Sequence, residues 1–155
     1  MPHPNNISEI LKSHTADLKW QREFYEDLHQ HPELSHHEER TAAQIEQKLR
    51  EFDCELITGI GGFGMAAIFR SDAEGPTVLM RADFDALPIT EETGVDFASS
   101  NGNMHACGHD MHATALLGAC AVIDSLRGQW SGTFIALFQP AEETLNGGRV
   151  MVEEG

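Results

Sequence analysis

The sequence predicts an α/β protein in which helices cover a mixed, mostly parallel sheet. Two observations lead to this prediction. Segments whose apolar residues follow the period of a helix alternate with short apolar runs of the kind that form strands. The chain is also long enough, at 155 residues, to bury a core as one domain, and 41% of its residues are hydrophobic. We therefore expect a layered domain with its functional site at one edge of the sheet.

Two helices are expected in the first third of the chain. Over residues 7–29 the apolar residues recur at the spacing of one helical face, and Pro32 stops the pattern. A second helix is expected to begin near Ser35. This serine stands three residues before Glu38, the spacing of a capping box, in which each side chain satisfies a free backbone N–H. Apolar residues then continue on one side as far as Phe52.

The middle and the end of the chain contain the predicted strands. Residues 54–69 hold a glycine-rich turn between two apolar pieces, which favours a hairpin or a bent connection. An apolar run follows at residues 77–80, then a helix over about 110–126. Residues 133–138, "TFIALF", form a continuous apolar run typical of a strand covered on both faces.

Chemically active residues follow both late strands. Asp83 and Asp85 come directly after the run at 77–80, and Glu142 and Glu143 follow "TFIALFQPA". Between them stands "NMHACGHDMH", at the start of the connecting helix. Sites in α/β sheets lie beyond the carboxyl ends of the strands. We therefore expect these three clusters to meet at one edge.

The charge and the cysteines exclude several classes of protein. There are 25 Asp and Glu residues against 10 Lys and Arg, a formal charge of −15, which is the wrong sign for binding nucleic acid or an anionic membrane. The longest mostly apolar run, residues 113–123, is too short to span a bilayer. The first residues do not resemble a secretory signal, and the three cysteines lack paired spacing. These features indicate a cytoplasmic protein with free thiols.

The segment Cys107-Gly108-His109 is a candidate metal site. Residues two apart diverge on a helix but share a face in an extended segment, and Gly108 would let the backbone turn there. Thiolate and imidazole are both good ligands for divalent metals. The alternative is an inert buried cysteine beside a histidine that caps a helix. The motif by itself is compatible with both.

The pair Glu142 and Glu143 favours hydrolytic chemistry. Adjacent carboxylates repel each other unless a cation or a proton separates them. One could bind a metal while the other takes a proton from the water that the metal activates. The alternative is an acidic first turn of a helix, which the helix dipole would stabilise.

The remaining candidates are acids and histidines. Asp83 and Asp85 could bind a metal directly or hold a histidine in place, or they could simply form a turn at the strand end. His105 would share the face of Cys107 in an extended segment, and His112 is left open. Four histidines flank a helix break and are expected on a polar surface without acid or thiol partners: His29, His31, His36 and His37.

Long motifs in the chain resemble those of a known family. "DLHQHPELSHHEERTA", "RADFDALPI", "NMHACGHDMHATALLGA" and "FQPAEE" occur in that order. They resemble the dimetal amidohydrolases of the aminoacylase and carboxypeptidase superfamily. The closest branch contains hippurate hydrolase and indole-acetyl-amino-acid hydrolase. The resemblance extends from about residue 20 to residue 155.

The resemblance implies hydrolysis of a small N-acyl amino acid to a carboxylic acid and a free amino acid. It implies two divalent ions, of zinc, manganese, nickel or cobalt. Cys107 would bridge the two ions, while His109 and Glu143 would be ligands. Glu142 would be the general base. Asp85 matches a catalytic acid that other branches place beside a metal-binding histidine.

The resemblance also implies a longer protein. Family members carry a dimerisation domain and two further histidine ligands beyond the region matched here, so residues 1–155 are expected to be the N-terminal portion of a zinc-peptidase-like catalytic domain. Alone they are expected to bind at most one metal, to be inactive, and to self-associate. Two alternatives remain open: a thiol hydrolase with Cys107 as nucleophile and His109 or His105 as base, and a non-catalytic metal-binding domain.

Overall fold

The computed structural model describes Glu9 and residues 18–155, and this part of the chain has an α/β fold. The first helix is predicted over residues 7–29. Most of its N-terminal half lies outside the described residues, and its second half is described. The elements, in chain order, are α2 (Leu18–Gln30), α3 (Glu39–Leu49), β1 (Glu55–Ile60), β2 (Gly64–Arg70), β3 (Thr77–Asp83), α4 (His109–Ser125), β4 (Thr133–Gln139) and α5 (Gly147–Glu154).

The sheet is mixed, but the prediction that it is mostly parallel is wrong. Its strand order is β1-β2-β4-β3, with β1/β2 and β2/β4 antiparallel and only β3/β4 parallel. The reason lies in the connections. The sequence predicts a hairpin or a bent connection for residues 54–69, and the glycine-rich turn joins β1 and β2 into a hairpin. The two strands of a hairpin are necessarily antiparallel. Only β3 reaches its neighbour through a helix, α4.

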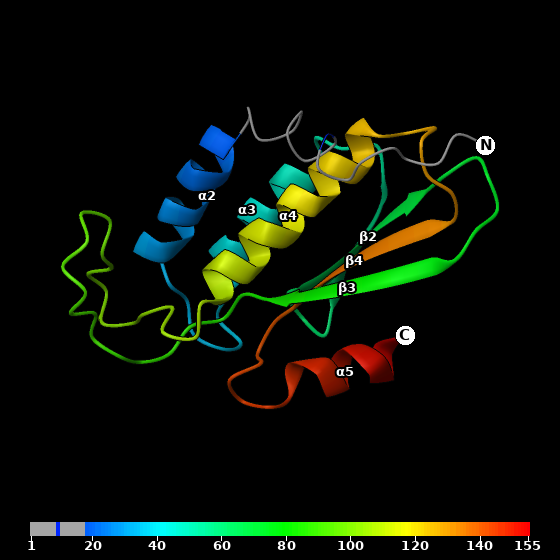
Figure 1. The fold of residues 1–155 in the computed structure, drawn as a ribbon. Helices are drawn as coiled ribbons and strands as arrows, with labels where there is room; N and C mark the ends of the chain where they lie inside the picture. Colours follow the sequence, from blue (N-terminus) through cyan, green and yellow to red (C-terminus); the bar gives the residue numbers. More distant parts are fainter. Residues whose placement is uncertain (1–8, 10–17) are drawn as a thin grey trace.

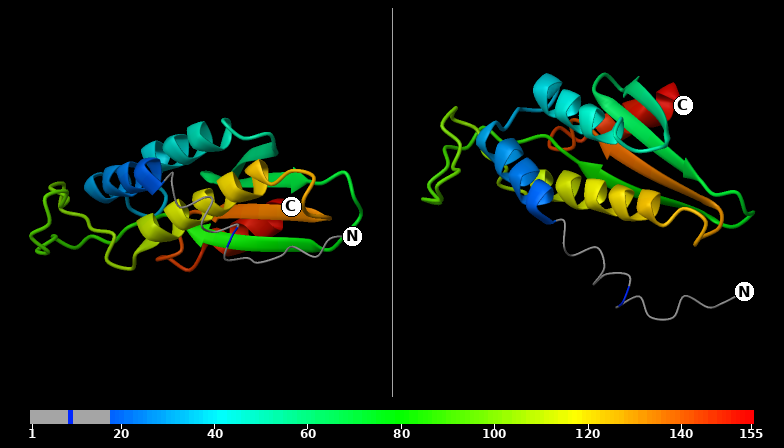
Figure 2. Two further views of the ribbon diagram at one scale, coloured as in Figure 1. Left: turned by 45° about the horizontal axis from the view of Figure 1, so that its top comes forward. Right: turned by 90° about the horizontal axis from the view of Figure 1, so that it is seen from above.

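The helices lie on both faces of the sheet. Helices α2, α3 and α4 lie over one face, with α5 on the opposite face near the C-terminus (Figures 1 and 2). Alternate residues of the central strands point toward the three-helix face and are buried there: Met65, Ala67 and Phe69 of β2, and Phe134, Ala136 and Phe138 of β4. Within the described residues, no helix is both long and apolar enough to cross a membrane.

Strand β3 forms an edge of the sheet and is poorly covered. Val78 is 50% exposed, Leu79 55% and Met80 49%, although all three are apolar. By contrast Ala82 and Asp83, at the end of the same strand, are buried. The covered end of β3 is therefore the end at which the predicted site lies.

The capping box predicted at the start of α3 does not form. The side chain of the N-cap residue, Glu38, does not form a capping hydrogen bond with the helix. Instead the carboxylate of Glu33 accepts the amide N–H groups of Arg40 and Thr41, at 3.1 and 2.6 Å. The side chains of Ser35 and Glu38 bond to residues far along the chain, in the loops that build the site described below.

Candidate metal centre

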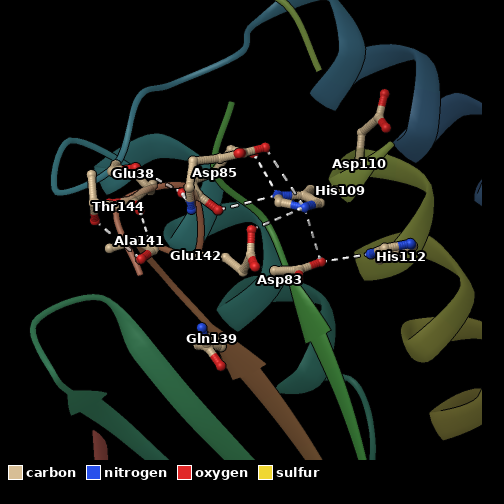
Figure 3. A network of polar contacts seen from close by, with 12 residues as sticks. Glu38, Asp83, Asp85, His109, Asp110, His112, Gln139, Ala141, Glu142 and Thr144 are labelled. Carbon is tan, nitrogen blue, oxygen red and sulfur yellow. Dashed lines mark hydrogen bonds and ion pairs between the residues drawn. The ribbon is translucent and has the colours of Figure 1, made fainter. Parts of the chain in front are cut away.

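The carboxyl ends of β3 and β4 lie side by side. The two strands pair in parallel with Asp83 opposite Gln139, and α4 begins beside the same edge. Figure 3 shows that Asp83, Asp85, Glu142 and His109 gather there. The expected convergence of the three clusters is therefore observed.

His109 is the centre of this group. Its Nδ1 donates to the backbone oxygen of Asp85 at 2.9 Å and also faces the Asp85 carboxylate at 3.2 Å. A carbonyl oxygen can only accept, so Nδ1 carries a proton. The other ring nitrogen, Nε2, faces three carboxylates: Asp83 at 3.5 Å, Glu142 at 3.8 Å and Glu143 at 3.9 Å. Nε2 is therefore the atom that can bind a metal ion.

The pKa of the His109 ring reflects these neighbours. Burial alone would lower the pKa, because a charged ring is poorly solvated there. The hydrogen bond with Asp85 and the negative charge of Asp83 outweigh burial, so the pKa lies above its usual value. The pocket therefore favours positive charge at this position.

The backbone conformation that brings Cys107 close to His109 differs from the one predicted. The two residues are not in an extended segment: a turn closes from Gly108 N–H to the oxygen of His105 at 3.1 Å. Gly108 then adopts a left-handed conformation, with φ 78°, immediately before α4. Glycine tolerates this conformation at little cost. The sulfur of Cys107, a nitrogen of His109 and an oxygen of Glu143 consequently lie within 4.8 Å of one another.

The thiol of Cys107 is protonated at neutral pH in the metal-free chain. It hydrogen-bonds to the carboxylate of Glu143, and this bond is the main cause that raises its pKa to about 11. Cys107 is an exposed residue, but the slight burial of its thiol and the negative charges of Glu143, Glu142 and Asp83 add to the effect. A bound cation would reverse this balance, because it stabilises the thiolate.

Asp85 is buried behind His109 and connects it to the opposite loop. Its carboxylate accepts the hydroxyl of Ser35 at 2.8 Å and the backbone N–H of Glu143 at 2.9 Å. Burial opposes ionisation, but the hydrogen bonds, first among them the one with His109, lower its pKa to about 2. Asp85 is therefore an ionised residue that contacts Nδ1 of His109 and leaves Nε2 free.

Glu142 and Glu143 do not lie in a helix. They follow Ala141, which has an unusual φ of 51°, in a turn that precedes α5. The buried carboxylate of Glu38 accepts the backbone N–H of Ala141 at 2.8 Å and so holds this turn (Figure 3). One buried oxygen of Glu143 has no hydrogen-bond partner among the described residues. An unpaired buried carboxylate oxygen is costly, and a bound cation would satisfy it.

His112, which the sequence left open, belongs to a second group. Its Nδ1 donates to Asp83 at 2.6 Å, and its ring stacks on that of His109 at 5.5 Å. Asp83, His109 and His112 also offer ligand atoms within 4.8 Å of one another. Both groups include His109, whose Nδ1 is engaged by Asp85, so one ion bound through Nε2 at either group excludes His109 from the other.

The expectation for the N-terminal histidines is wrong for one of them. His31, His36 and His37 are exposed, as expected. His29 is buried, and its ring bonds to the carboxylates of Asp110 and Glu91. These partners stand 81 and 62 residues further along the chain, so no local pattern could reveal them.

His105 is also buried, but it does not join the metal-binding groups of the described residues. Burial lowers its pKa, and both ring nitrogens lack a hydrogen-bond partner in this part of the chain. The shared face with Cys107 that an extended segment would produce is therefore absent.

The sequence and the fold of this chain are similar to those of known metallohydrolases. Residues 79–155 match the model of peptidase family M20/M25/M40. The chain is 39% identical over 153 residues to the hippurate hydrolase of Campylobacter jejuni and 41% identical over 131 residues to an N-acetylcysteine deacetylase of Bacillus subtilis. Its fold matches that of a dinuclear metal-binding M20 peptidase from Bacillus subtilis, with a TM-score of 0.83 and 38% identity.

These matches cover most of this chain and a smaller part of each relative. They take in 97% of the chain and 38% of the hippurate hydrolase, and 83% of the chain and 34% of the deacetylase. For the solved peptidase the shares are 94% and 40%. The chain thus spans between about a third and two-fifths of the length of these relatives, and the resemblance inferred from its motifs is confirmed.

Proposed function

The chain belongs to peptidase family M20/M25/M40, and on this premise we propose that it carries part of the active site of a metal-dependent amidohydrolase. The proposed reaction is hydrolysis of the amide bond of a small N-acyl amino acid. The observation that carries the proposal is the grouping of a thiol, an imidazole and a carboxylate within 4.8 Å, with Glu142 directly beside them.

The side chains of this group fit a divalent ion. Cys107, His109 and Glu143 offer sulfur, nitrogen and oxygen donors, a set suited to Zn²⁺ and related ions. The unpaired buried oxygen of Glu143 and the thiol of Cys107 would each gain a partner when a cation binds. Bound ions would supply Lewis acidity, which acidifies water and polarises an amide carbonyl.

We assign the proton transfer to Glu142. Its carboxylate lies 3.8 Å from His109 Nε2 and its side chain is 33% exposed, so water and substrate can reach it. It takes the proton of the attacking water and passes it to the departing nitrogen. Asp85 is assigned a positioning role: it holds the proton of His109 at Nδ1, which keeps the lone pair of Nε2 available for an ion.

Two ions, of zinc, manganese, nickel or cobalt, are proposed for an enzyme of the relatives' full length, and at most one for these 155 residues. Three protein ligands suffice for one ion with an open position and not for two. Residues 1–155 are accordingly proposed to be the N-terminal portion of the catalytic domain, inactive alone. A cytoplasmic location would keep the three cysteines, which are free, in the reduced state.

A thiol hydrolase is the weaker alternative. A nucleophilic cysteine needs a lowered pKa and an imidazole as its base. The pKa of Cys107 is instead raised to about 11, and its thiol bonds to the carboxylate of Glu143. Nδ1 of His109 is already engaged by Asp85. The arrangement stabilises a thiol and not a nucleophilic thiolate.

The test uses a hybrid in which these residues replace the matching segment of the Bacillus subtilis M20 peptidase. The hybrid should bind two ions per chain and hydrolyse N-acetyl or N-benzoyl amino acids. Glu142→Gln should keep both ions and lose about 10²–10⁴-fold in turnover, because an amide cannot accept the proton. The matched control is Glu23→Gln, an exposed residue of α2.

Three outcomes would contradict the proposal. Full activity in the Glu142→Gln hybrid would remove the assigned base. Inhibition of the metal-loaded hybrid by a thiol-alkylating reagent but not by a chelator would favour the thiol hydrolase. Loss of ions together with activity in Glu142→Gln would make Glu142 a ligand and overturn its role as base.

A further inference from the structure

His29 lies near the C-terminal end of α2, and both of its ring nitrogens face carboxylates. Nδ1 lies 2.6 Å from Asp110 and Nε2 lies 2.9 Å from Glu91. The side chains of all three residues are at least nine-tenths buried. The rings of Tyr25 and Phe97 pack against the imidazole, with centroids 5.6 and 5.3 Å away.

This geometry determines the protonation of the ring. A carboxylate has no proton to donate, so each short contact requires the ring nitrogen to be the donor. A neutral imidazole has one N–H, while an imidazolium has two. His29 is therefore an imidazolium held between two anions. Burial works against this charge, but the bonds with Glu91 and Asp110 outweigh it and raise the pKa of His29.

The two carboxylates belong to different parts of the chain. Glu91 lies in the segment between β3 and α4, and it also accepts the hydroxyl of Thr93 and, at 2.6 Å, the backbone N–H of Ser99. Asp110 lies in the first turn of α4, directly after His109, and its second oxygen accepts the N–H of Met111 at 2.8 Å. The ring of His29 thus joins α2, this segment and the start of α4 through two buried contacts.

We propose that His29 is a positioning residue: its doubly donating ring clamps the segment 84–108 and the start of α4 to α2, and thereby sets the positions of Cys107 and His109. Cys107 and Gly108 stand at the end of that segment. His109 bonds to Asp85 and directly precedes Asp110 in the first turn of α4. The link to metal binding depends on the proposed metal centre; the clamp itself does not.

Other charged groups around the ring do not replace these two partners. Tyr25 is on the same helix, and the charges of Asp110 and Glu91, after burial, raise its pKa, so it stays neutral. His105 lies on the segment that the clamp holds; burial lowers its pKa, and the positive charge of His29 contributes in the same direction. His29 is consequently the charged member among the ring groups of this cluster.

The first measurement concerns the ring itself. Nitrogen NMR of the 155-residue chain without metal, at pH 7.5, should show both nitrogens of His29 protonated. Glu91→Gln removes one anion while keeping the imidazole, so one nitrogen should lose its proton at that pH and the amide of Ser99 should exchange faster. The amide of Ala98, which bonds to the oxygen of Val95 within the same segment, is the internal reference.

The second measurement concerns metal. Affinity for Zn²⁺ is obtained by competition with a chromophoric chelator for the wild type, His29→Gln and His31→Gln. His29→Gln should weaken binding on the order of tenfold, as loss of outer-shell support typically does. His31→Gln should bind as the wild type does, because His31 is exposed, follows the end of α2, and its ring contacts Asp27 of that helix.

The outcomes separate the clamp from the proposed function. A neutral His29 ring at pH 7.5 overturns the clamp whatever the metal data show. A doubly protonated ring with unchanged zinc affinity in His29→Gln overturns its positioning role. Absence of zinc binding in the wild type rejects the metal centre. In that case the protonation of the His29 ring and the exchange rate of the Ser99 amide still test the clamp. Should His29→Gln fail to fold, Glu91→Gln provides both readouts.

Discussion

The carboxylate of Asp85 accepts the backbone N–H of Glu143 at 2.9 Å, although the two residues stand 58 positions apart in the sequence. The same carboxylate faces Nδ1 of His109 at 3.2 Å. One buried anion therefore sets the position of two proposed ligands relative to each other. The site is organised by groups that are themselves not expected to touch an ion.

Asp85→Asn should destabilise the metal-free chain by about 2 kcal/mol at pH 7, since an amide cannot accept from all three donors and leaves buried N–H or O–H groups unpaired. The folded-state pKa of Asp85 is about 2, below its ordinary 3.8, so its stabilising effect is present above pH 3.8 and lost as the pH falls through 2. Urea unfolding measures the difference. Asp72→Asn, at an exposed residue, is the surface control; an equal effect there would contradict the anchor role.

Cys107 should react slowly with iodoacetamide at pH 8 in the metal-free chain, because its pKa is about 11 and the thiolate is the reactive form. Glu143→Gln should accelerate the reaction, because it removes the hydrogen-bonded anion that raises this pKa. Added zinc should protect the wild-type thiol. Cys54 and the buried Cys120 serve as references within the same sample. Unchanged reactivity of Cys107 in Glu143→Gln would show that the two side chains do not interact.

These 155 residues should bind at most one zinc ion, because both candidate groups include His109 and Asp85 already engages its Nδ1. Cys107→Ser should weaken that binding strongly, since a hydroxyl is a poorer ligand than a thiolate. His112→Ala should leave it nearly unchanged if the ion lies between Cys107 and Glu143. Metal analysis of protein dialysed against zinc gives the stoichiometry. Two tightly bound ions, or hydrolysis of N-acyl amino acids by this chain alone, would contradict the prediction.

The clamp at His29 should stabilise the fold most between about pH 4.5 and 6.5. The pKa of His29 is raised above 6.5 in the folded chain, so its contribution is present below that pH and lost as the pH rises through the folded value. The pKa of Glu91 is lowered from 4.5 to about 2, so its contribution is lost as the pH falls toward 2. The difference in unfolding free energy between the wild type and His29→Gln should follow this window. A difference in unfolding free energy that grows above pH 8 would contradict the charged state of His29 on which the clamp depends.

The exposed edge at β3 should make the chain self-associate. An edge strand with consecutive apolar side chains, Val78, Leu79 and Met80, offers unpaired backbone groups to a second strand. The formal charge of −15 opposes association, so added salt should strengthen it. Sedimentation velocity at rising salt measures this. Leu79→Lys should restore the monomer, whereas Val152→Lys, on α5, should not. A wild type that stays monomeric at high salt would contradict the prediction.

Features with a local signal were predictable. The helical period, the glycine-rich hairpin and the acid-ended strands are short-range patterns, and the observed elements follow them closely from α3 onward. The convergence of Asp83, Asp85, His109, Glu142 and Glu143 also followed from local order, because parallel neighbours must end at the same edge. The motifs that carry the family resemblance are likewise contiguous.

The sequence by itself thus determined the class of fold, the family and the chemical types gathered at the site. Only the tertiary structure decided the strand directions and the partners of the polar side chains. Ser35 and Glu38 have the spacing of a capping box, yet they bond to Asp85 and Ala141, 50 and 103 residues away. The ring of His29 binds two carboxylates that lie far away in the sequence. The reason is physical: a buried polar group must be paired, and the partner is whichever group the packing of distant elements brings within reach.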